Sequence, residues 1–155
     1  HKNMKKFFNI IAALLLAVVS TSCLDSGLEE LETYKDCDIT SGEIYWRYYS
    51  TDVIPGSGEQ QVKQVRLARA VEQNLDTNTF YIRYVTGNIP EAERGNFTEG
   101  KAVIAVTIST AAVIKPIGDA PKLGVPGDWT KDNQYEVTAA DGTKKTWTIV
   151  VEPYQ

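Results

Sequence analysis

Apolar and polar residues alternate with a period of two through most of the chain after residue 36, which is the pattern of strands with one buried face. The alternation runs through residues 43–49, 62–71, 79–86, 101–109, 134–139 and 144–151. It predicts an all-β domain of short strands. In each of the first three strands, we expect the apolar side to face the core of the domain. These sides carry Ile44, Trp46 and Tyr48; Val65, Leu67 and Val71; and Phe80, Ile82 and Tyr84.

Turn residues separate these runs and indicate how the strands connect. Residues 55–58 (PGSG) and 74–78 each join neighbouring strands, and Asp141-Gly142 between alternating runs is a strong hairpin signal. The long polar stretch 87–100 suits a crossover between two sheets, as in a Greek key. The chain is therefore expected to fold as an antiparallel β-sandwich of the Greek-key type.

The N-terminal residues follow a different pattern, which predicts an export signal. A basic start at Lys5 and Lys6 is followed by an almost entirely apolar run and by small residues that lead to Cys23. This order is typical of a secretory signal peptide, and the run is shorter than the roughly 20 residues that span a bilayer. We divide the chain into a signal peptide (1–22), an acidic tether (23–35) and one β-domain (36–155).

The small residues before Cys23 resemble a lipobox, in the loose form common among lipoproteins of the Bacteroidetes. The resemblance implies that the mature chain begins at Cys23 and that lipid on this residue makes the membrane a partner. The acidic residues after Cys23 resemble the surface-export signal of such lipoproteins, which implies an exposed location on the outer membrane. An ordinary cleaved signal peptide with a coincidental cysteine is the alternative.

Composition narrows the chemistry of the mature chain. The whole chain has a net charge of −4, and removing residues 1–22 removes Lys2, Lys5 and Lys6 but no acidic residue. The mature chain is therefore more acidic, and we expect no nucleic-acid partner. The single histidine is His1, in the leader, which excludes Ser-His-Asp and Cys-His catalysis and histidine-ligated zinc. No catalytic residue, metal site or cofactor is predicted.

The chain has two cysteines, and lipidation of Cys23 would leave Cys37 without an intramolecular partner. We expect Cys37 to be a half-buried small apolar residue at the first strand. An intermolecular disulfide is the alternative.

The C-terminal third carries motifs that resemble a known module. Residues 126–129 (PGDW), 135–143 (YEVTAADGT) and 147–151 (WTIVV) resemble the ending of immunoglobulin-like domains in Bacteroidetes surface lipoproteins, which are often encoded beside polysaccharide-uptake systems. The resemblance covers about residues 108–151 and is weaker over 36–107. It implies an immunoglobulin-like β-sandwich and transfers no catalytic residue. In physical terms, we expect Gly127 to permit a tight turn and Trp129 to plug one end of the sandwich.

If the apolar sides face the core, the opposite sides of the early strands form an outward face rich in Tyr and Arg. Such a face suits sugar rings, which offer C–H faces and hydroxyls, and it equally suits a protein interface. A solvated sheet face is the structural alternative, in which Tyr–Arg cross-strand pairs contribute about 0.2–1 kcal/mol each. A Ca²⁺ site at Asp128 and Asp132 has no supporting ligand spacing. The residues of the predicted face are Tyr45, Arg47, Tyr49, Tyr81 and Arg83, with Arg66 between them.

Three functions are compatible with these features. The leading hypothesis is a non-enzymatic surface module that binds glycan or assists a polysaccharide-uptake complex. The second is a structural or adhesive spacer that contacts protein partners. The third is an enzyme with paired carboxylates, which has little support because the acidic residues are scattered on loops. We therefore expect no enzymatic activity.

Overall fold

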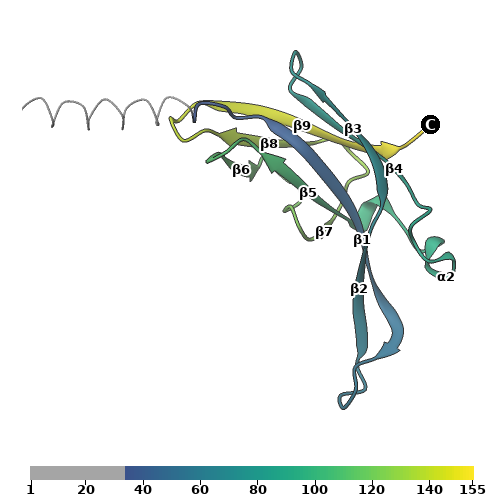
Figure 1. Ribbon diagram of the computed structural model, residues 1–155. Coiled ribbons are helices and arrows are strands. Elements are labelled where there is room, and N and C mark those ends of the chain that lie inside the picture. Colours follow the sequence, from purple (N-terminus) through teal and green to yellow (C-terminus); the bar gives the residue numbers. More distant parts are fainter. Residues whose placement is uncertain (1–33) are drawn as a thin grey trace, which may run out of the picture.

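Two β-sheets packed face to face make up residues 34–155, the part of the chain that the computed structural model describes (Figure 1). The first sheet has the strand order β2-β1-β5-β7, and the second has β3-β4-β9-β8-β6. The predicted all-β sandwich is confirmed. The predicted signal peptide, Cys23 and the tether up to residue 33 lie outside the described residues. The elements are β1 (Ile39–Val53), β2 (Gln60–Arg66), β3 (Ala68–Asn74), β4 (Thr79–Val85), α2 (Glu91–Arg94), the 3-10 helix η1 (Glu99–Lys101), β5 (Ala102–Ile108), β6 (Val113–Pro116), β7 (Pro126–Gly127), β8 (Asn133–Thr138) and β9 (Lys144–Pro153).

The connections follow the predicted turns. Hairpins join β1 to β2, β3 to β4 and β8 to β9, and Gly142 in the last hairpin has a φ of 91°, a conformation that favours glycine. The segment between β4 and β5 crosses from the second sheet to the first, as predicted, and contains α2 and η1. No helix within residues 34–155 is long and apolar enough to cross a membrane.

One pairing departs from the antiparallel pattern. The C-terminal strand β9 lies between β4 and β8 and runs parallel to β4, with Phe80 opposite Ile149. The other strand pairs of the described chain are antiparallel. The strand β9 is therefore at the centre of the second sheet, with a hydrogen-bonded strand on each side.

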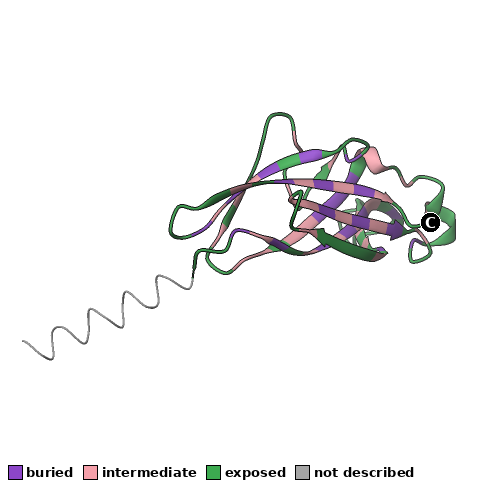
Figure 2. Ribbon diagram, turned by 90° about the horizontal axis from the view of Figure 1, so that it is seen from above, coloured by how far each residue is buried: buried purple, intermediate pink, exposed green. Residues whose placement is uncertain are grey.

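The core lies between the two sheets and consists largely of the alternating side chains that the sequence pattern predicted. Figure 2 shows buried positions alternating with less buried ones along the strands. Trp129 is 1% exposed, which confirms its expected structural role, and Trp147 is 0% exposed. Fully burying one large apolar side chain contributes about 1.5–3 kcal/mol relative to its exposure. The core of large side chains includes Ile39, Ile44, Phe80, Ile82, Ile104, Tyr135, Trp147 and Ile149.

Cys37 is more deeply buried than predicted. It is 1% exposed, directly precedes β1 and has a free thiol. The indole Nε1 of Trp147 donates to the Cys37 carbonyl oxygen at 3.0 Å. Burial raises the pKa of the Cys37 thiol, which disfavours the reactive thiolate. Cys37 therefore serves packing, and its position does not suit an intermolecular disulfide.

Leu67 marks the point at which one extended segment leaves the first sheet and enters the second. The single strand predicted over residues 62–71 is divided into β2 and β3, which lie in different sheets. Leu67 is 1% exposed, and its N–H donates to the Ile44 carbonyl oxygen at 2.9 Å. Beyond the crossing, Val71 pairs with Ile82 but is 39% exposed, because β3 forms the edge of its sheet. Val71 is therefore not the core residue that was predicted.

β1 is long enough to form part of the first sheet and to extend beyond the sandwich. Its 15 residues begin near the β8–β9 turn, where Lys145 Nζ lies 2.7 Å from Asp38 Oδ1. Its far end forms a projecting two-stranded ribbon with β2, and we call residues 49–62 the arm (Figure 1). The pairing within the arm shifts register between Tyr49 and Val53. The described chain thus enters at one end of the sandwich, and the arm projects to the side at the far end of β1.

Truncation of Leu67 tests the crossing. Removing most of a fully buried leucine leaves a cavity and costs about 2–5 kcal/mol. We expect Leu67→Ala to lower the free energy of unfolding by about that amount in a urea titration followed by tryptophan fluorescence. Leu75→Ala is the matched control, because Leu75 is 57% exposed in the β3–β4 turn and its truncation should cost less than about 0.5 kcal/mol. Equal effects of the two substitutions would contradict the role given to Leu67.

Candidate functional site

The six Tyr and Arg residues predicted to share one face lie on two different sheets. Because the outer sides of two packed sheets point in opposite directions, the six do not form the single face that was expected. The cause is the crossing at Leu67, which places β4 in the second sheet while β1 stays in the first. The first sheet carries Tyr45, Arg47, Tyr49 and Arg66, and the second carries Tyr81 and Arg83.

On the second sheet, the charge of Arg83 is already neutralised. Its guanidinium lies 2.7 Å from a carboxylate oxygen of Glu72 and 2.8 Å from one of Glu152, and it stacks over the Tyr81 ring at 4.6 Å. These carboxylates also raise the pKa of Arg83. A hollow of about 300 Å³ beside Arg83 is bordered by Tyr154 and small side chains of β3. This arrangement matches the structural alternative, in which cross-strand pairs stiffen a solvated face.

On the first sheet, the outward residues of β1 and β2 form a cross-strand ladder that we call the arm face. Its rows are Tyr45 opposite Arg66, Arg47 opposite Gln64, and Tyr49 opposite Val62. β5 accompanies β1 only as far as Tyr45, so Arg47 and Tyr49 have no strand on that side. The Tyr49 side chain is consequently prominent, with 72% of the residue exposed.

The two arginines of the arm face keep most of their charge available. Arg47 donates from Nε to Gln64 Oε1 at 3.0 Å and from Nη2 to the Gly124 carbonyl oxygen at 3.2 Å. Within residues 34–155, no carboxylate oxygen lies within 4.0 Å of its guanidinium. The Arg66 side chain is 67% exposed and lies 4.0 Å from Glu43, which is bound more closely by Arg69 at 2.7 Å. The arm face is therefore locally basic on an acidic protein.

Two shallow hollows flank Tyr49. One has a volume of about 350 Å³ and is lined by Arg47, Tyr48, Tyr49, Val62 and Pro126. The other has a volume of about 360 Å³ and lies between the arm and the segment that contains α2. The second hollow combines apolar and polar side chains and is lined by Tyr48, Tyr49, Ser50, Thr51, Asp52, Lys63, Pro90, Ala92 and Glu93.

An aromatic cluster fixes α2 against the sandwich and so shapes the second hollow. The Phe97 ring packs edge-to-face on Trp46 and Tyr84, with centroids 5.2 and 5.1 Å apart. The indole Nε1 of Trp46 donates to Glu93 Oε1 at 3.1 Å, and the Tyr84 hydroxyl donates to Glu99. Burial and the Glu99 carboxylate raise the pKa of Tyr84. The sequence predicted only a polar connection here, and Ile89 and Phe97 were the signals of a packed segment.

Comparison with known proteins places the chain in a family. The family model described as DUF5018-related matches residues 39–150. The chain belongs to the DUF5018-related family. A crystal structure of a candidate secreted protein from Bacteroides fragilis is 36% identical to it, with a TM-score of 0.68, and the match covers 79% of this chain and 98% of that one. Among curated proteins, none matches the sequence.

A second solved structure is more distant. It is a candidate glycoside hydrolase from Bacteroides thetaiotaomicron, 21% identical, and the match covers 78% of this chain and 26% of that one. Its TM-score of 0.45 is too low to indicate a common fold, so its activity implies nothing for this DUF5018-related chain.

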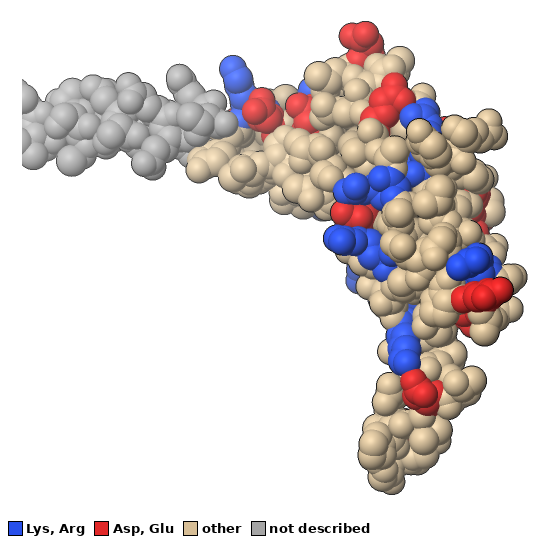
Figure 3. All heavy atoms as spheres, turned by 45° about the vertical axis from the view of Figure 1, so that its right-hand side comes forward, with Lys and Arg blue, Asp and Glu red and all other residues tan. Residues whose placement is uncertain are grey.

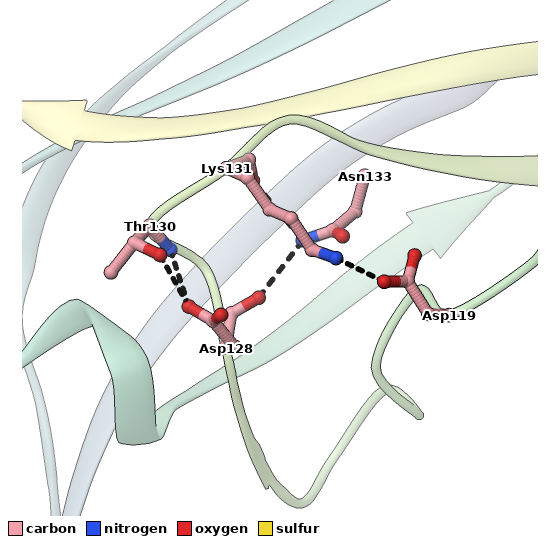
Figure 4. Close-up of polar contacts among 5 residues, drawn as sticks. All are labelled: Asp119, Asp128, Thr130, Lys131 and Asn133. Atoms are coloured by element: carbon pink, nitrogen blue, oxygen red, sulfur yellow. Dashed lines mark hydrogen bonds and ion pairs between the residues drawn. The ribbon is translucent and has the colours of Figure 1, made fainter.

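The carboxylates of this DUF5018-related domain do not gather into a metal site within residues 34–155, where no three His, Cys, Asp or Glu side chains are grouped for metal binding. Asp128, considered above for Ca²⁺, instead accepts hydrogen bonds from the Thr130 N–H at 3.0 Å and from the Thr130 hydroxyl at 2.5 Å (Figure 4). Asn133 donates to the Asp128 carbonyl oxygen, and Lys131 pairs with Asp119. These bonds fix the loop that carries Trp129, so Asp128 has a structural role.

Gly127 is required for a different reason from the one predicted. Its φ is not positive, so the residue does not serve a tight turn. It lies in β7 opposite Ala102, and a Cβ at this position would lie 2.3 Å from Pro121 Cβ. The missing side chain therefore gives the Pro121 ring space to pack against the edge of the first sheet.

The Thr130 hydroxyl is the main cause of the low pKa of Asp128, with the Thr130 N–H second. We expect Thr130→Val to raise the Asp128 pKa towards its ordinary value in a carboxyl NMR titration. A depressed carboxyl pKa stabilises the fold above the unfolded pKa, and this stability is lost as pH falls through the folded pKa. Thr130→Val should therefore reduce the acid-induced loss of stability. Asp141, whose pKa is lowered by Thr143, is the internal control and should not shift.

Proposed function

We propose that this chain is a lipid-anchored module of the bacterial cell surface that binds glycans without cleaving them. The observation that carries the proposal is Tyr49, which is 72% exposed between two hollows and beside the available donors of Arg47. Aromatic rings can lie against the C–H faces of sugars, while nearby polar groups hold the hydroxyls. The arm face offers both kinds of contact over one continuous surface.

The position of the arm supports a role at the cell surface. The described chain enters at one end of the sandwich, and the arm leaves the sandwich at the far end of β1 and projects to the side (Figure 1). A lipid on Cys23 would hold the entry end at the membrane and leave the arm, at the far end of β1, accessible to ligands. The similar Bacteroides fragilis protein is described as a candidate secreted protein, which agrees with export.

A binding role fits the carboxylates of the second hollow better than catalysis does. Asp52 pairs with Lys63 at 2.5 Å, and this bond lowers the Asp52 pKa. Glu93 accepts the Trp46 indole on one oxygen and the Asn96 amide on the other. Glycoside hydrolysis needs an acid and a base or nucleophile facing each other across the scissile bond. Both carboxylates of this hollow already hold other groups.

A second candidate function is a spacer or adhesive module that contacts protein through the arm. The observation that favours it is the apolar surface of the arm, where Val53, Ile54 and Val62 are 54%, 41% and 58% exposed. Exposed apolar side chains on a ribbon without a core behind it are typical of contact surfaces. Membrane cross-linking that traps a protein at the arm, together with no glycan binding, would favour this function.

Glycan binding is tested by substitution of one exposed tyrosine. We expect the leaderless chain to bind at least one polysaccharide on an array of bacterial, plant and host glycans. Tyr49→Ala should then weaken binding about fivefold, the equivalent of about 1 kcal/mol for one aromatic contact. Tyr154→Ala is the matched control, because Tyr154 is 59% exposed on the second sheet. An equal loss in both variants, or no binding on the whole array, would contradict the proposal.

The anchor is tested separately by Cys23→Ala. The substitution removes the thiol that would carry lipid, so the protein should leave the outer-membrane fraction and appear in soluble form. Detergent phase partitioning and metabolic labelling with a fatty-acid analogue measure the change. Cys37→Ala is the control and should leave both readouts unchanged. A Cys23→Ala protein that still fractionates with the outer membrane would contradict lipidation at this site.

A further inference from the structure

The arginines of the described chain differ in how their charges are balanced. Arg69 and Arg83 each have a carboxylate at 2.7 Å, and Arg94 donates to two main-chain carbonyl oxygens. On the side of the molecule drawn in Figure 3, several basic side chains lie next to acidic ones on a surface formed mostly by other residues. Arg47 and Arg66 also have no carboxylate closer than 4.0 Å within residues 34–155, and both lie on the arm face. Their charges are therefore available to a ligand.

The strand geometry brings these two charges together on the arm face. Arg47 pairs with Gln64 and Tyr45 pairs with Arg66, so Arg47 and Arg66 are diagonal neighbours on adjacent strands, about 7–8 Å apart. Tyr45 and Tyr49 lie two residues on either side of Arg47, about 13 Å from each other at about 3.3 Å per residue. A chain of linked rings that follows β1 would pass one aromatic ring, then a cation, then a second aromatic ring.

Arg47 is also held in place while keeping donors free. A guanidinium has five N–H donors, and two of those of Arg47 bind Gln64 and Gly124. The two bonds orient the planar group, and the remaining donors have no partner within the described residues. A guanidinium prefers carboxylates, which it can bind through two parallel hydrogen bonds. The first hollow, which Arg47 lines with Tyr49, gives such a group a place beside an aromatic wall.

From this arrangement we infer that the arm face binds an acidic saccharide, a chain containing uronic acid, whose carboxylates pair with Arg47 and Arg66. The inference rests on the proposed glycan-binding function and names its ligand class. Tyr45 and Tyr49 contact the sugar rings, and the two arginines select carboxylated chains over neutral ones. The acidic remainder of the protein repels polyanions elsewhere on its surface, which confines them to this face.

The test compares ligands that differ only in charge. The leaderless chain is titrated calorimetrically with oligosaccharides of polygalacturonate, alginate and hyaluronan, each as the free acid and as its methyl ester. At least one free acid, which is ionised to its carboxylate at neutral pH, should bind. Its methyl ester should bind at least about tenfold more weakly, because esterification removes the charge that the guanidinium recognises. Poly-glutamate, which has carboxylates without sugar rings, should bind at least about tenfold more weakly than that acid.

Variants assign the effect to the two arginines. Arg66→Gln should weaken binding of the free acid about fivefold, while binding of the ester stays unchanged. Arg47→Gln should weaken it at least as much. Lys144→Gln is the charge-matched control on the second sheet, where the Lys144 side chain is 60% exposed, and it should have no effect. Circular dichroism verifies that each variant is folded.

The outcomes separate the ligand class from the function. Equal binding of acid and ester, equal losses in Arg66→Gln and Lys144→Gln, or equal binding of poly-glutamate would overturn the inference. Binding of neutral glycans that depends on Tyr49, without binding of any of the three acids, would also overturn it but leave the proposed function standing. No binding of any glycan, neutral or acidic, would overturn both.

Discussion

The crossing of the chain at Leu67 is the constraint on which the rest of the structure depends. One extended segment is the edge of the first sheet before this residue and the edge of the second sheet after it. Because the Leu67 N–H binds the Ile44 carbonyl oxygen and its side chain is buried, the segment is held at the boundary between the sheets. The sheet membership of β4, and hence the separation of the Tyr and Arg residues into two groups, follows from this crossing.

The accessibility of the arm face follows from the unequal neighbours of β1. β5 pairs with β1 only from Ile39 to Tyr45, whereas β2 continues beside it to Val53. Arg47 and Tyr49 thus lie beyond the region in which strands flank β1 on both sides. Their environment contrasts with that of Arg83, which is enclosed by two carboxylates and a tyrosine ring. Pairing geometry, more than residue type, therefore distinguishes the proposed binding face from the solvated one.

The sequence pattern predicted the secondary structure and the core of this fold well, because residues two apart along a strand lie on the same side of it. Ile44, Phe80 and Ile82 were assigned to the buried side on this basis, and the Asp141-Gly142 hairpin was predicted from turn chemistry. The period carries no information about which sheet a strand joins. The crossing at Leu67, the parallel pairing of β9 with β4 and the exposure of Val71 depend on long-range contacts and could not be predicted.

The candidate site was predicted only in part for the same reason. Tyr45, Arg47, Tyr49 and Arg66 were correctly grouped as neighbours, since β1 and β2 are adjacent in the chain and join through a short turn. Tyr81 and Arg83 were wrongly added, because alternation alone could not separate the two outer faces. The hollow beside α2 was missed, since a polar connection gives no periodic signal, and only Ile89 and Phe97 marked it as packed.

The central claim is that ligands bind to the arm face and not to the outer side of the second sheet. Amide NMR spectra of the leaderless chain, recorded during titration with the uronic-acid oligosaccharide that binds it most tightly in calorimetry, test it most directly. We expect the shifts that follow the ligand concentration to cluster at residues 45–49 and 62–66, with Tyr81, Arg83 and Tyr154 unchanged. Shifts centred on β4 and the C-terminal residues, with the arm face unaffected, would contradict the claim.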